Sequence, residues 1–304
     1  MKLLNIGLRW VMVCWVGACV TASWAQYTPQ PGVWVARDFT FHDGSTLPEV
    51  KLAYTTLGDP KNPAIVVLHG TNDSGTSMLR PDFGGVLFGA GQPFDAQHHF
   101  IVLPDALGAG RSSKPSDGLA ARFPSYTYQD MVTATHRLLT QGLGLTHVRL
   151  VIGNSMGGMH TWLMGILYPD FADVLIPMAS LPIAMSGRNW MMRKFIVDAI
   201  RNDPDYQGGF YKTQPKSAQY ANAIYALATN GGANGIQKKA PTRELADQLM
   251  DQALKAPFTA DANDTLYRWN AARDFAPEPD LERIKATVLM INSADDERNP
   301  PDLI

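Results

Sequence analysis

Five short apolar runs, each followed by polar residues and a helical pattern, constrain the fold of this chain more than any other feature. Continuous apolar runs rich in β-branched residues are typical of strands buried on both faces of a sheet. Their alternation with helical segments predicts an α/β fold with a mostly parallel sheet. Before them, residues 33–57 predict two antiparallel strands around a turn at His42-Asp43-Gly44. The five runs are Ala64 to Leu68, Phe100 to Leu103, Val148 to Ile152, Val174 to Met178 and Thr287 to Asn292.

Polar or catalytic residue types stand where these strands should end. Residues 69–72 follow the first run, Asp105 follows the second, Ser155 follows the third and Asp296 follows the last. Open α/β sheets bind ligands outside the carboxyl ends of their strands. We therefore expect one site to gather these residues at that edge of the sheet.

Gly153-Asn154-Ser155-Met156-Gly157 matches the pattern G-x-S-x-G, in which a sharp turn from strand into helix exposes a nucleophilic serine. A chance match is a real alternative in a chain with 26 glycines. The context favours the catalytic interpretation, because an apolar strand precedes the motif and a helical stretch, residues 158–168, follows it. The sequence predicts Ser155 as a nucleophile rather than as part of a plain glycine turn.

A serine nucleophile needs two backbone N–H donors directed at the oxyanion of its tetrahedral intermediate. We assign these donors to Met156, the residue after the nucleophile, and to Thr71, in the loop after the first buried strand. Asn72 is expected to line the substrate pocket beside them. His69 precedes the same loop, and we interpret it as a residue that shapes the loop rather than as the catalytic base.

The acid of a serine triad should follow the strand after residues 181–281, where two aspartates stand side by side. We favour Asp296 over Asp295, because Asp296 lies four residues before Pro300; the alternative is that both are solvated loop acids. In such enzymes the histidine base follows the acid along the chain, and no histidine follows Asp296. We therefore expect this chain to be a C-terminally incomplete, catalytically impaired form that lacks a final strand and helix. The rival hypothesis is a degenerate protein in which His69 acts as the base.

Residues 181–281 interrupt the alternation with a run of helical segments, which predicts a helical cap inserted before the last strand of the sheet. The core is then residues 26–180 and 282–304. Within the cap, Trp190, Met191 and Phe195 are candidates to line a substrate pocket. The alternative is that these side chains only pack the cap onto the core.

The first 25 residues predict a secretory signal peptide. Lys2 and Arg9 supply its positive start, an apolar stretch of about a dozen residues follows, and cleavage is expected after Ala25. Such a stretch is shorter than the roughly 20 residues that a membrane anchor needs. Lipoprotein processing at Cys19 is a second possibility. We expect a periplasmic or secreted protein.

Composition excludes several classes of function. The 26 basic and 28 acidic residues give a net charge of −2, without the basic excess of a nucleic-acid-binding protein. Both cysteines lie within the predicted signal peptide, so the mature chain has no disulfide and no cysteine-ligated metal. We expect a small-molecule acyl substrate, no cofactor and no metal. The oligomeric state stays open, with a dimer among the possibilities.

Together these motifs resemble the homoserine O-acetyltransferase-like branch of the α/β-hydrolase superfamily. The resemblance covers nearly all of the mature chain, and its most specific part is Asp203-Pro204-Asp205-Tyr206-Gln207-Gly208-Gly209 with Tyr211. It implies an α/β-hydrolase fold and a Ser-Asp-His enzyme that forms an acyl-serine and passes the acyl group to an acceptor.

Three departures from the transferases favour water as the acceptor. Asp105 stands where the transferases usually have asparagine, Ile196-Val197 stands where they tend to have Gln-Arg, and acetyl-CoA is not expected in the predicted compartment. We therefore expect an exported serine hydrolase that cleaves an ester, thioester or related acyl bond. The alternatives are an O-acyltransferase of the homoserine O-acetyltransferase type, a non-catalytic ligand-binding homologue, and other chemistry of this fold such as carbon–carbon cleavage.

Overall fold

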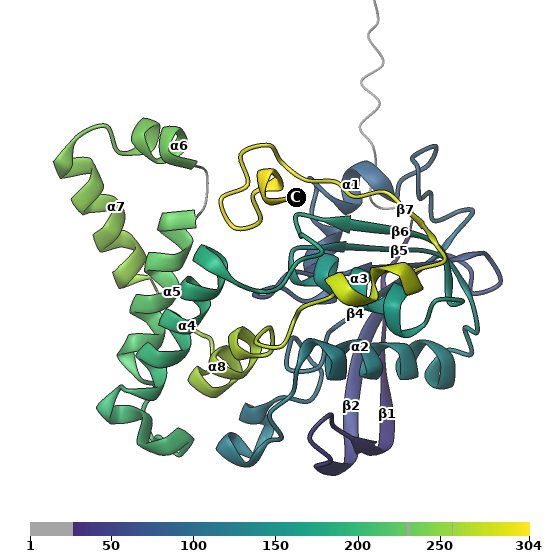
Figure 1. Cartoon of the computed structure of the whole chain (residues 1–304), viewed down its shortest axis with the longest axis horizontal. Coiled ribbons are helices and arrows are strands. Elements are labelled where there is room, and N and C mark those ends of the chain that lie inside the picture. The colour runs from purple at the N-terminus through teal and green to yellow at the C-terminus, as the bar shows by residue number, and fades with distance from the viewer. Residues whose placement is uncertain (1–26, 230–231, 257) are drawn as a thin grey trace, which may run out of the picture.

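The computed structural model describes residues 27–229, 232–256 and 258–304, so the predicted signal peptide lies outside the described residues. A seven-stranded sheet in the order β1-β2-β4-β3-β5-β6-β7 runs through the molecule (Figure 1). The hairpin of β1 and β2 is antiparallel and joins β4 in antiparallel fashion, and all later neighbours are parallel. The strands are β1 (Gln30–Thr40), β2 (Thr46–Leu57), β3 (Ala64–Leu68), β4 (Phe100–Pro104), β5 (Val148–Asn154), β6 (Ala172–Met178) and β7 (Thr287–Val288).

The apolar runs became central strands because both of their faces are covered. All five residues of β3 and all five of β4 are buried, as a continuous apolar run requires. The predicted antiparallel pair around residues 42–44 is also confirmed as β1 and β2. The sequence therefore predicted the α/β class, the parallel centre of the sheet and its antiparallel start.

The last run is a correction to the sequence analysis. Thr287 to Asn292 was expected to be a buried strand, but only Thr287–Val288 is a strand and both of its residues are exposed. The N–H groups of Leu289 and Ile291 still donate to carbonyls of β6, at 2.9 and 3.1 Å. The physical reason is position, because β7 is an edge strand that pairs on one side only, so its apolar character does not lead to burial.

Helices flank the sheet and form a second layer beyond it. Helix α3 packs on β3, β5 and β6, and α2 packs on α3. A capping box opens α2: the Thr127 N–H donates to Asp130 Oδ2 at 2.8 Å, and the Asp130 N–H donates back to Thr127 Oγ1 at 3.4 Å. The α-helices are α1 (Gly84–Leu87), α2 (Tyr128–Arg137), α3 (Met156–Leu167), α4 (Gly187–Arg201), α5 (Lys216–Thr229), α6 (Gly232–Lys239), α7 (Arg243–Lys255) and α8 (Ala262–Asn270).

Shorter helical segments occupy several connections. The described residues contain a π-helical segment, Leu138–Gly142, directly after α2. The 3₁₀ segments are Gly75–Leu79, Pro115–Asp117, Ala120–Arg122, Pro204–Gly209, Glu278–Arg283 and Pro301–Leu303.

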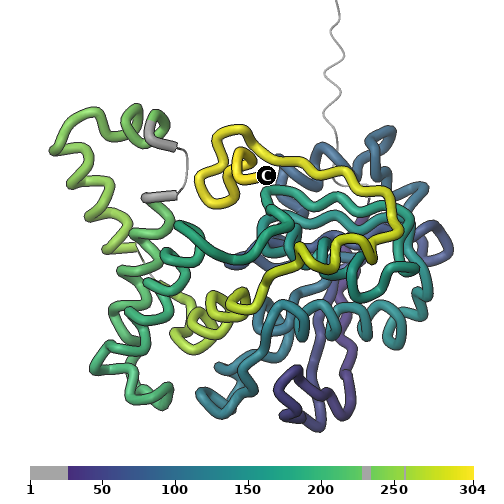
Figure 2. Tube along the Cα trace, in the orientation of Figure 1, coloured from purple at the N-terminus to yellow at the C-terminus, as the bar shows by residue number. Residues whose placement is uncertain are grey.

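Helices α4 to α8 lie between β6 and β7 in the chain, in the region where a cap was expected. Figure 2 follows the chain from β6 out through these helices and back past α8 to β7. These five helices fill the region in which the sequence predicted a run of helical segments. Helices α4, α5 and α8 share a hydrophobic cluster of their own, centred on Ile196, Val197, Tyr225, Leu266 and Trp269. No described helix has the length and hydropathy needed to cross a bilayer.

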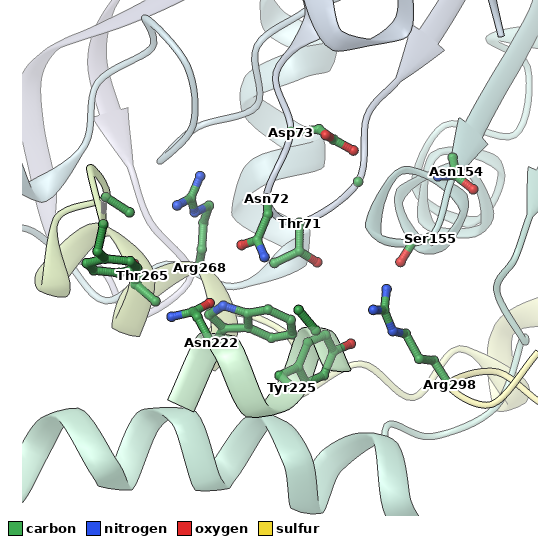
Figure 3. Close-up of a pocket in the computed structure, with 15 residues that line it drawn as sticks. Thr71, Asn72, Asp73, Asn154, Ser155, Asn222, Tyr225, Thr265, Arg268 and Arg298 are labelled. Carbon is green, nitrogen blue, oxygen red and sulfur yellow. The ribbon is translucent and has the colours of Figure 1, made fainter. Parts of the chain in front are cut away.

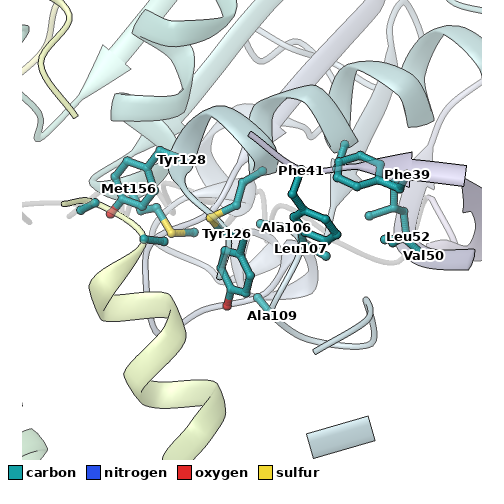
Figure 4. Close-up of a cluster of buried hydrophobic side chains, with 14 of the residues drawn as sticks. Phe39, Phe41, Val50, Leu52, Ala106, Leu107, Ala109, Tyr126, Tyr128 and Met156 are labelled. Atoms are coloured by element: carbon teal, nitrogen blue, oxygen red, sulfur yellow. The ribbon is translucent and has the colours of Figure 1, made fainter. Parts of the chain in front are cut away.

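A second buried cluster supports the edge of the sheet where the strands end. Phe39 and Phe41 of the first hairpin, Leu107 after β4 and Tyr128 of α2 pack together with Met156 of α3 (Figure 4). Phe39 and Phe41 meet edge to face, with ring centroids 4.9 Å apart. Segments far apart in sequence are thus held against the first residue of α3.

Arg193 joins the helices after β6 to the core. Its side chain is only 2% exposed, and it extends from α4 to the first residue of α2. Nη1 donates to the Tyr128 hydroxyl at 3.1 Å, Nε donates to Asn189 Oδ1 at 2.9 Å, and the guanidinium lies 5.0 Å from the centre of the Trp269 ring. A buried cation of this kind is tolerated because its hydrogen bonds and an aromatic face replace water.

We predict that Arg193→Met lowers the free energy of unfolding by roughly 1–3 kcal/mol, because it keeps the aliphatic stem but leaves buried hydrogen-bond partners unsatisfied. The measurement is urea unfolding followed by circular dichroism. Arg201→Met is the matched control, because Arg201 is an exposed arginine on the same helix. Equal destabilisation by the two substitutions would contradict the role given to Arg193.

Candidate active site

Ser155 lies at the turn between β5 and α3, as the sequence predicted. It is the N-cap of α3 and has φ 55° and ψ −113°, a conformation that a residue with a side chain adopts only under strain. Two backbone hydrogen bonds hold the turn: the Ser155 N–H donates to Met178 O at 2.9 Å, and the Met159 N–H donates to Ser155 O at 2.9 Å. The strain fixes the side chain at the end of the strand, where it is half-buried.

The glycines of the motif have a direct steric reason. A Cβ on Gly153 would collide with the carbonyl of Gly157, and a Cβ on Gly157 would collide with the carbonyl of Leu68 in β3. Gly158 lies equally close to Met178 and Ser180. Because these obstacles are mostly backbone atoms, a side chain could be accommodated only by moving α3 away from the sheet.

The two residues assigned to the oxyanion hole flank Ser155. Thr71 lines the same cavity as Ser155, and an ideal Cβ on Gly70 would lie 3.9 Å from the Ser155 Cβ, so the loop after β3 runs beside the serine. Met156 is the first residue of α3, where a backbone N–H has no acceptor within the helix. Its side chain is fully buried, which fixes its backbone in place. Both residues thus lie close to Ser155, Thr71 in the wall of the same cavity and Met156 next in the chain.

His69 is held by the backbone on both ring nitrogens. Nε2 accepts a hydrogen bond from the Ala106 N–H at 3.0 Å, so the proton is on Nδ1, which donates to the Gly70 carbonyl at 2.7 Å. Burial lowers the pKa of His69, so the ring stays neutral. This arrangement supports the interpretation that His69 shapes the loop, and it argues against the rival hypothesis that His69 is a base for Ser155.

Asp296 is fixed by its own loop. Its Oδ1 accepts from the N–H groups of Arg298 and Asn299, each at 2.8 Å. The side chain is half-buried and is not among the described residues that line the cavity around Ser155, whereas Asp295 is exposed. The loop thus separates the two aspartates, with Asp296 oriented by the fold and Asp295 directed to solvent.

None of the seven histidines, all of which lie in the described part of the chain, lines the cavity around Ser155. Their ring partners lie elsewhere: His42 Nδ1 contacts Asp130 at 2.7 Å, His147 contacts Asp173 at 2.9 Å, and the His160 ring packs on Tyr128. Nor do the described residues contain a cluster of three or more His, Cys, Asp or Glu side chains able to hold a metal ion.

The cavity beside Ser155 has a volume of about 450 Å³ and lies between the strand ends and the helices after β6 (Figure 3). Asn72 lines it, as expected. Sequence reasoning missed most of the other lining side chains, because they come from α5, α8 and the loop after β7. The lining residues are Gly70, Thr71, Asn72, Asp73, Asn154, Ser155, Asn222, Tyr225, Ala226, Phe258, Ala260, Thr265, Arg268, Trp269 and Arg298.

The pocket residues expected from α4 are a correction. Trp190, Met191 and Phe195 are not among the described residues that line this cavity, and the side chains of Met191 and Phe195 are 71% and 47% exposed. Helix α4 directs a different face inward. Ile196 and Val197 lie on that face, inside the cluster that joins the helices, so this departure from the transferases also lies outside the cavity.

The alternating layers and the serine turn define a chain of the α/β-hydrolase type. A family model described as the alpha/beta hydrolase fold matches residues 63–303, and the chain belongs to this family. The expected similarity to the homoserine O-acetyltransferase-like branch is confirmed by the comparisons below.

Two curated relatives are similar over much of the chain. A "Probable acyltransferase" of Methanothermobacter thermautotrophicus is 27% identical over 278 residues, which cover 88% of this chain and 82% of that protein. A "Homoserine O-acetyltransferase" of Chlorobaculum parvum is 33% identical over 228 residues, 69% of this chain and 58% of that protein. The chain thus spans little more than half the length of the second relative.

Among solved structures, an acetylester hydrolase from Corynebacterium glutamicum superimposes with a TM-score of 0.74 at 20% identity. The match covers 89% of this chain and 82% of that one. At this level of identity the likeness establishes the shared fold alone.

We predict that acid destabilises the protein through its buried histidines. Burial lowers the pKa of His160 to about 3, whereas an unfolded histidine takes up its proton near pH 6.5. Between these values the unfolded state binds more protons, so stability falls as the pH decreases, by up to about 1.4 kcal/mol per pH unit for this residue.

The variant His160→Phe keeps an aromatic ring against Tyr128 and removes the titrating group. Between pH 7 and pH 5, urea unfolding should show that the parent chain loses roughly 2 kcal/mol more stability than the variant. Parallel losses in the two chains would mean that His160 does not contribute to the acid sensitivity.

Proposed function

We propose that this chain is an exported serine hydrolase that cleaves an ester, thioester or related acyl bond through an acyl-serine on Ser155. The observation that carries the proposal is the strained Ser155 at the strand–helix turn, with its side chain beside a cavity of about 450 Å³. A strained residue in a cavity wall is a feature that folds maintain for function. The probable acyltransferase among the similar proteins supports acyl chemistry.

In the proposed reaction the Ser155 Oγ attacks the acyl carbonyl carbon, and the negative charge that develops on the carbonyl oxygen is stabilised by the N–H groups of Met156 and Thr71. The bond from carbon to the leaving group then breaks, and the serine proton is transferred to that group. Water attacks the acyl-serine, releasing the acid and restoring the serine hydroxyl. Asp296 is proposed as the acid of the triad, which would orient a histidine base, although no histidine of this chain lines the cavity.

The loop after β4 supports hydrolysis over transfer. The buried Asp105 accepts the Gly75 N–H on Oδ1 at 2.7 Å and the Arg111 N–H on Oδ2 at 2.8 Å. An asparagine, which the resemblance leads one to expect in a transferase, could accept only one of these bonds, because its amide nitrogen is a donor. The loop of this chain is therefore built around an aspartate.

An acyltransferase is the second candidate function, because the curated relatives include a probable acyltransferase and a homoserine O-acetyltransferase. The two candidate functions differ in the molecule that accepts the acyl group. An added alcohol that outcompetes water for the acyl group would favour transfer, whereas free acid as the main product would favour hydrolysis. A non-catalytic ligand-binding homologue is the third reading, and it predicts no covalent intermediate.

We predict that the chain forms an acyl-serine with p-nitrophenyl acetate and that Ser155→Ala abolishes it. With no histidine lining the cavity, turnover should be slow, and the turn and its N–H donors should supply most of the remaining acceleration. Mass spectrometry of rapidly quenched protein should locate one acetyl group on the peptide containing Ser155.

Ser125→Ala is the matched control, because Ser125 is an exposed serine elsewhere on the core. This variant should be acetylated to the same extent as the parent chain. Acetylation at another residue, or none in the parent chain, would contradict the role proposed for Ser155 and favour the ligand-binding reading.

Export is proposed from the sequence pattern of residues 1–25, and we predict cleavage between Ala25 and Gln26. Intact-mass measurement on the periplasmic fraction of a bacterial host should show a chain that begins at Gln26. Lipid on Cys19 would instead establish the lipoprotein alternative, and Cys19→Ala separates the two, because only lipoprotein processing needs that thiol. An uncleaved chain in the cytoplasm would contradict export altogether.

A further inference from the structure

Four side chains that line the cavity around Ser155 carry buried polar atoms without a hydrogen-bond partner. These atoms are Oγ1 of Thr71, Oγ1 of Thr265, Nε of Arg268 and Nε1 of Trp269. Buried polar groups in folded proteins are almost always paired, and four of the ten unpaired side-chain atoms in the described residues belong to residues around this one cavity, which favours a ligand site here. Arginine and tryptophan nitrogens only donate, and threonine hydroxyls can donate, so the matching ligand is rich in acceptors.

Two carboxylates that line a neighbouring cavity together with Arg268, those of Asp261 and Asp264, already accept hydrogen bonds from other residues. Both oxygens of Asp264 accept bonds from Ser116, at 2.9 Å from its N–H and 2.6 Å from its hydroxyl. Asp261 accepts the N–H groups of Asn263 and Asp264 on Oδ1 and the Gln214 amide on Oδ2. Arg268 has no ion pair with a carboxylate in the described residues. Its charge is therefore available to a ligand.

The position of Arg268 determines where such a ligand would place its charge. Thr265 and Arg268 are three residues apart on α8, so they share a face of that helix. In Figure 3, Thr265 and Arg268 lie on one side of the labelled group and Ser155 lies on the other, with Thr71 and Asn72 between them in this view. A molecule that reaches both ends would carry its acceptor group several bonds away from the carbon attacked by the serine.

We propose that Arg268 and Thr265 form a subsite for a carboxylate on the substrate. The preferred substrates are then esters or thioesters whose acyl or leaving group ends in a carboxylate, with a short chain between that group and the scissile bond. Apolar lining residues, Phe258, Ala226 and Ala260, would contact this chain. The inference rests on the proposed function only in placing the scissile bond at Ser155.

Asp73 is the carboxylate that opposes this arrangement, because it lines the same cavity and also a neighbouring one together with Arg268. A negative charge in the wall weakens the binding of an anion. The affinity of the cavity for an anionic ligand therefore depends on both the Asp73 and the Arg268 charges. Asp73 provides a second test with the opposite sign, because removal of its charge should tighten anion binding.

The experiment measures binding rather than turnover, with the Ser155→Ala chain so that no probe is consumed. Isothermal titration calorimetry compares monomethyl glutarate, which has one carboxylate, with dimethyl glutarate, which has none. We expect the monoester to bind more tightly. Arg268→Gln should weaken its binding at least about tenfold, the value of a lost hydrogen-bonded ion contact, and leave binding of the diester unchanged.

Three further variants make the result specific. Arg268→Lys keeps the charge but lacks Nε and should fall between the parent and Arg268→Gln, and Asp73→Asn should bind the monoester more tightly. Arg243→Gln is the matched control, because it removes the same charge from an exposed position on α7 and should have no effect. Far-UV circular dichroism checks that each variant is folded.

Equal binding of the two probes to the folded parent, or equal loss in Arg268→Gln and Arg243→Gln, would overturn the subsite. These outcomes are distinct from failure of the proposed function. A chain that acetylates Ser155 but binds both probes alike retains the hydrolase proposal and loses the subsite. A chain that binds the monoester through Arg268 but never acetylates Ser155 retains the subsite and loses the hydrolase proposal.

Discussion

The close approach of α3 to the sheet is the constraint on which the rest of the structure depends. The backbone at Gly153 and Gly157 passes so near to other backbone atoms that no side chain fits, and this proximity forces the turn that gives Ser155 its positive φ. Met156 then enters the buried cluster below the strand ends. Every other feature of the candidate site is arranged around a serine whose position is decided by backbone packing rather than by its own interactions.

The loops beside Ser155 are held by side chains that have no direct part in the proposed chemistry. His69 links the loops after β3 and β4 through the Gly70 carbonyl and the Ala106 N–H, and Asp105 links them through the Gly75 and Arg111 N–H groups. Buried hydrogen bonds of this kind are costly to leave unmade, so they hold the loops in one arrangement. The polar residues at this edge of the sheet thus fall into two groups: a framework, His69 and Asp105, which holds the loops, and a cavity wall, which includes Thr71.

The cavity wall differs from the framework in how its polar atoms are paired. His69 and Asp105 have partners on both of their ring nitrogens or carboxylate oxygens, whereas Thr71, Thr265 and Arg268 each carry a buried atom without one. A buried polar group without a partner costs stability, and a ligand that supplies the partner offsets that cost. Within the loops and helices around Ser155, the contrast distinguishes His69 and Asp105, which hold the loops, from three residues of the cavity wall.

The sequence by itself determined the α/β class, the central strands, the turn at Ser155 and the loop containing Thr71 and Asn72. These features follow from local rules: apolar runs define buried strands, and the spacing of two glycines around a serine is a steric requirement of one short turn. It also indicated the helical insert, because helical periodicity is visible without knowledge of its neighbours.

Only the tertiary structure decided which face of α4 is buried and which residues complete the cavity. Met191 and Phe195 are apolar yet exposed, and Arg268 and Tyr225, more than sixty residues from the serine in sequence, line the cavity instead. It also decided that the last apolar run is an exposed edge strand. The physical reason is that a side chain is buried only when another segment packs against it. The sequence gives the chemical nature of each side chain, but which distant segment it contacts depends on the packing of the whole fold.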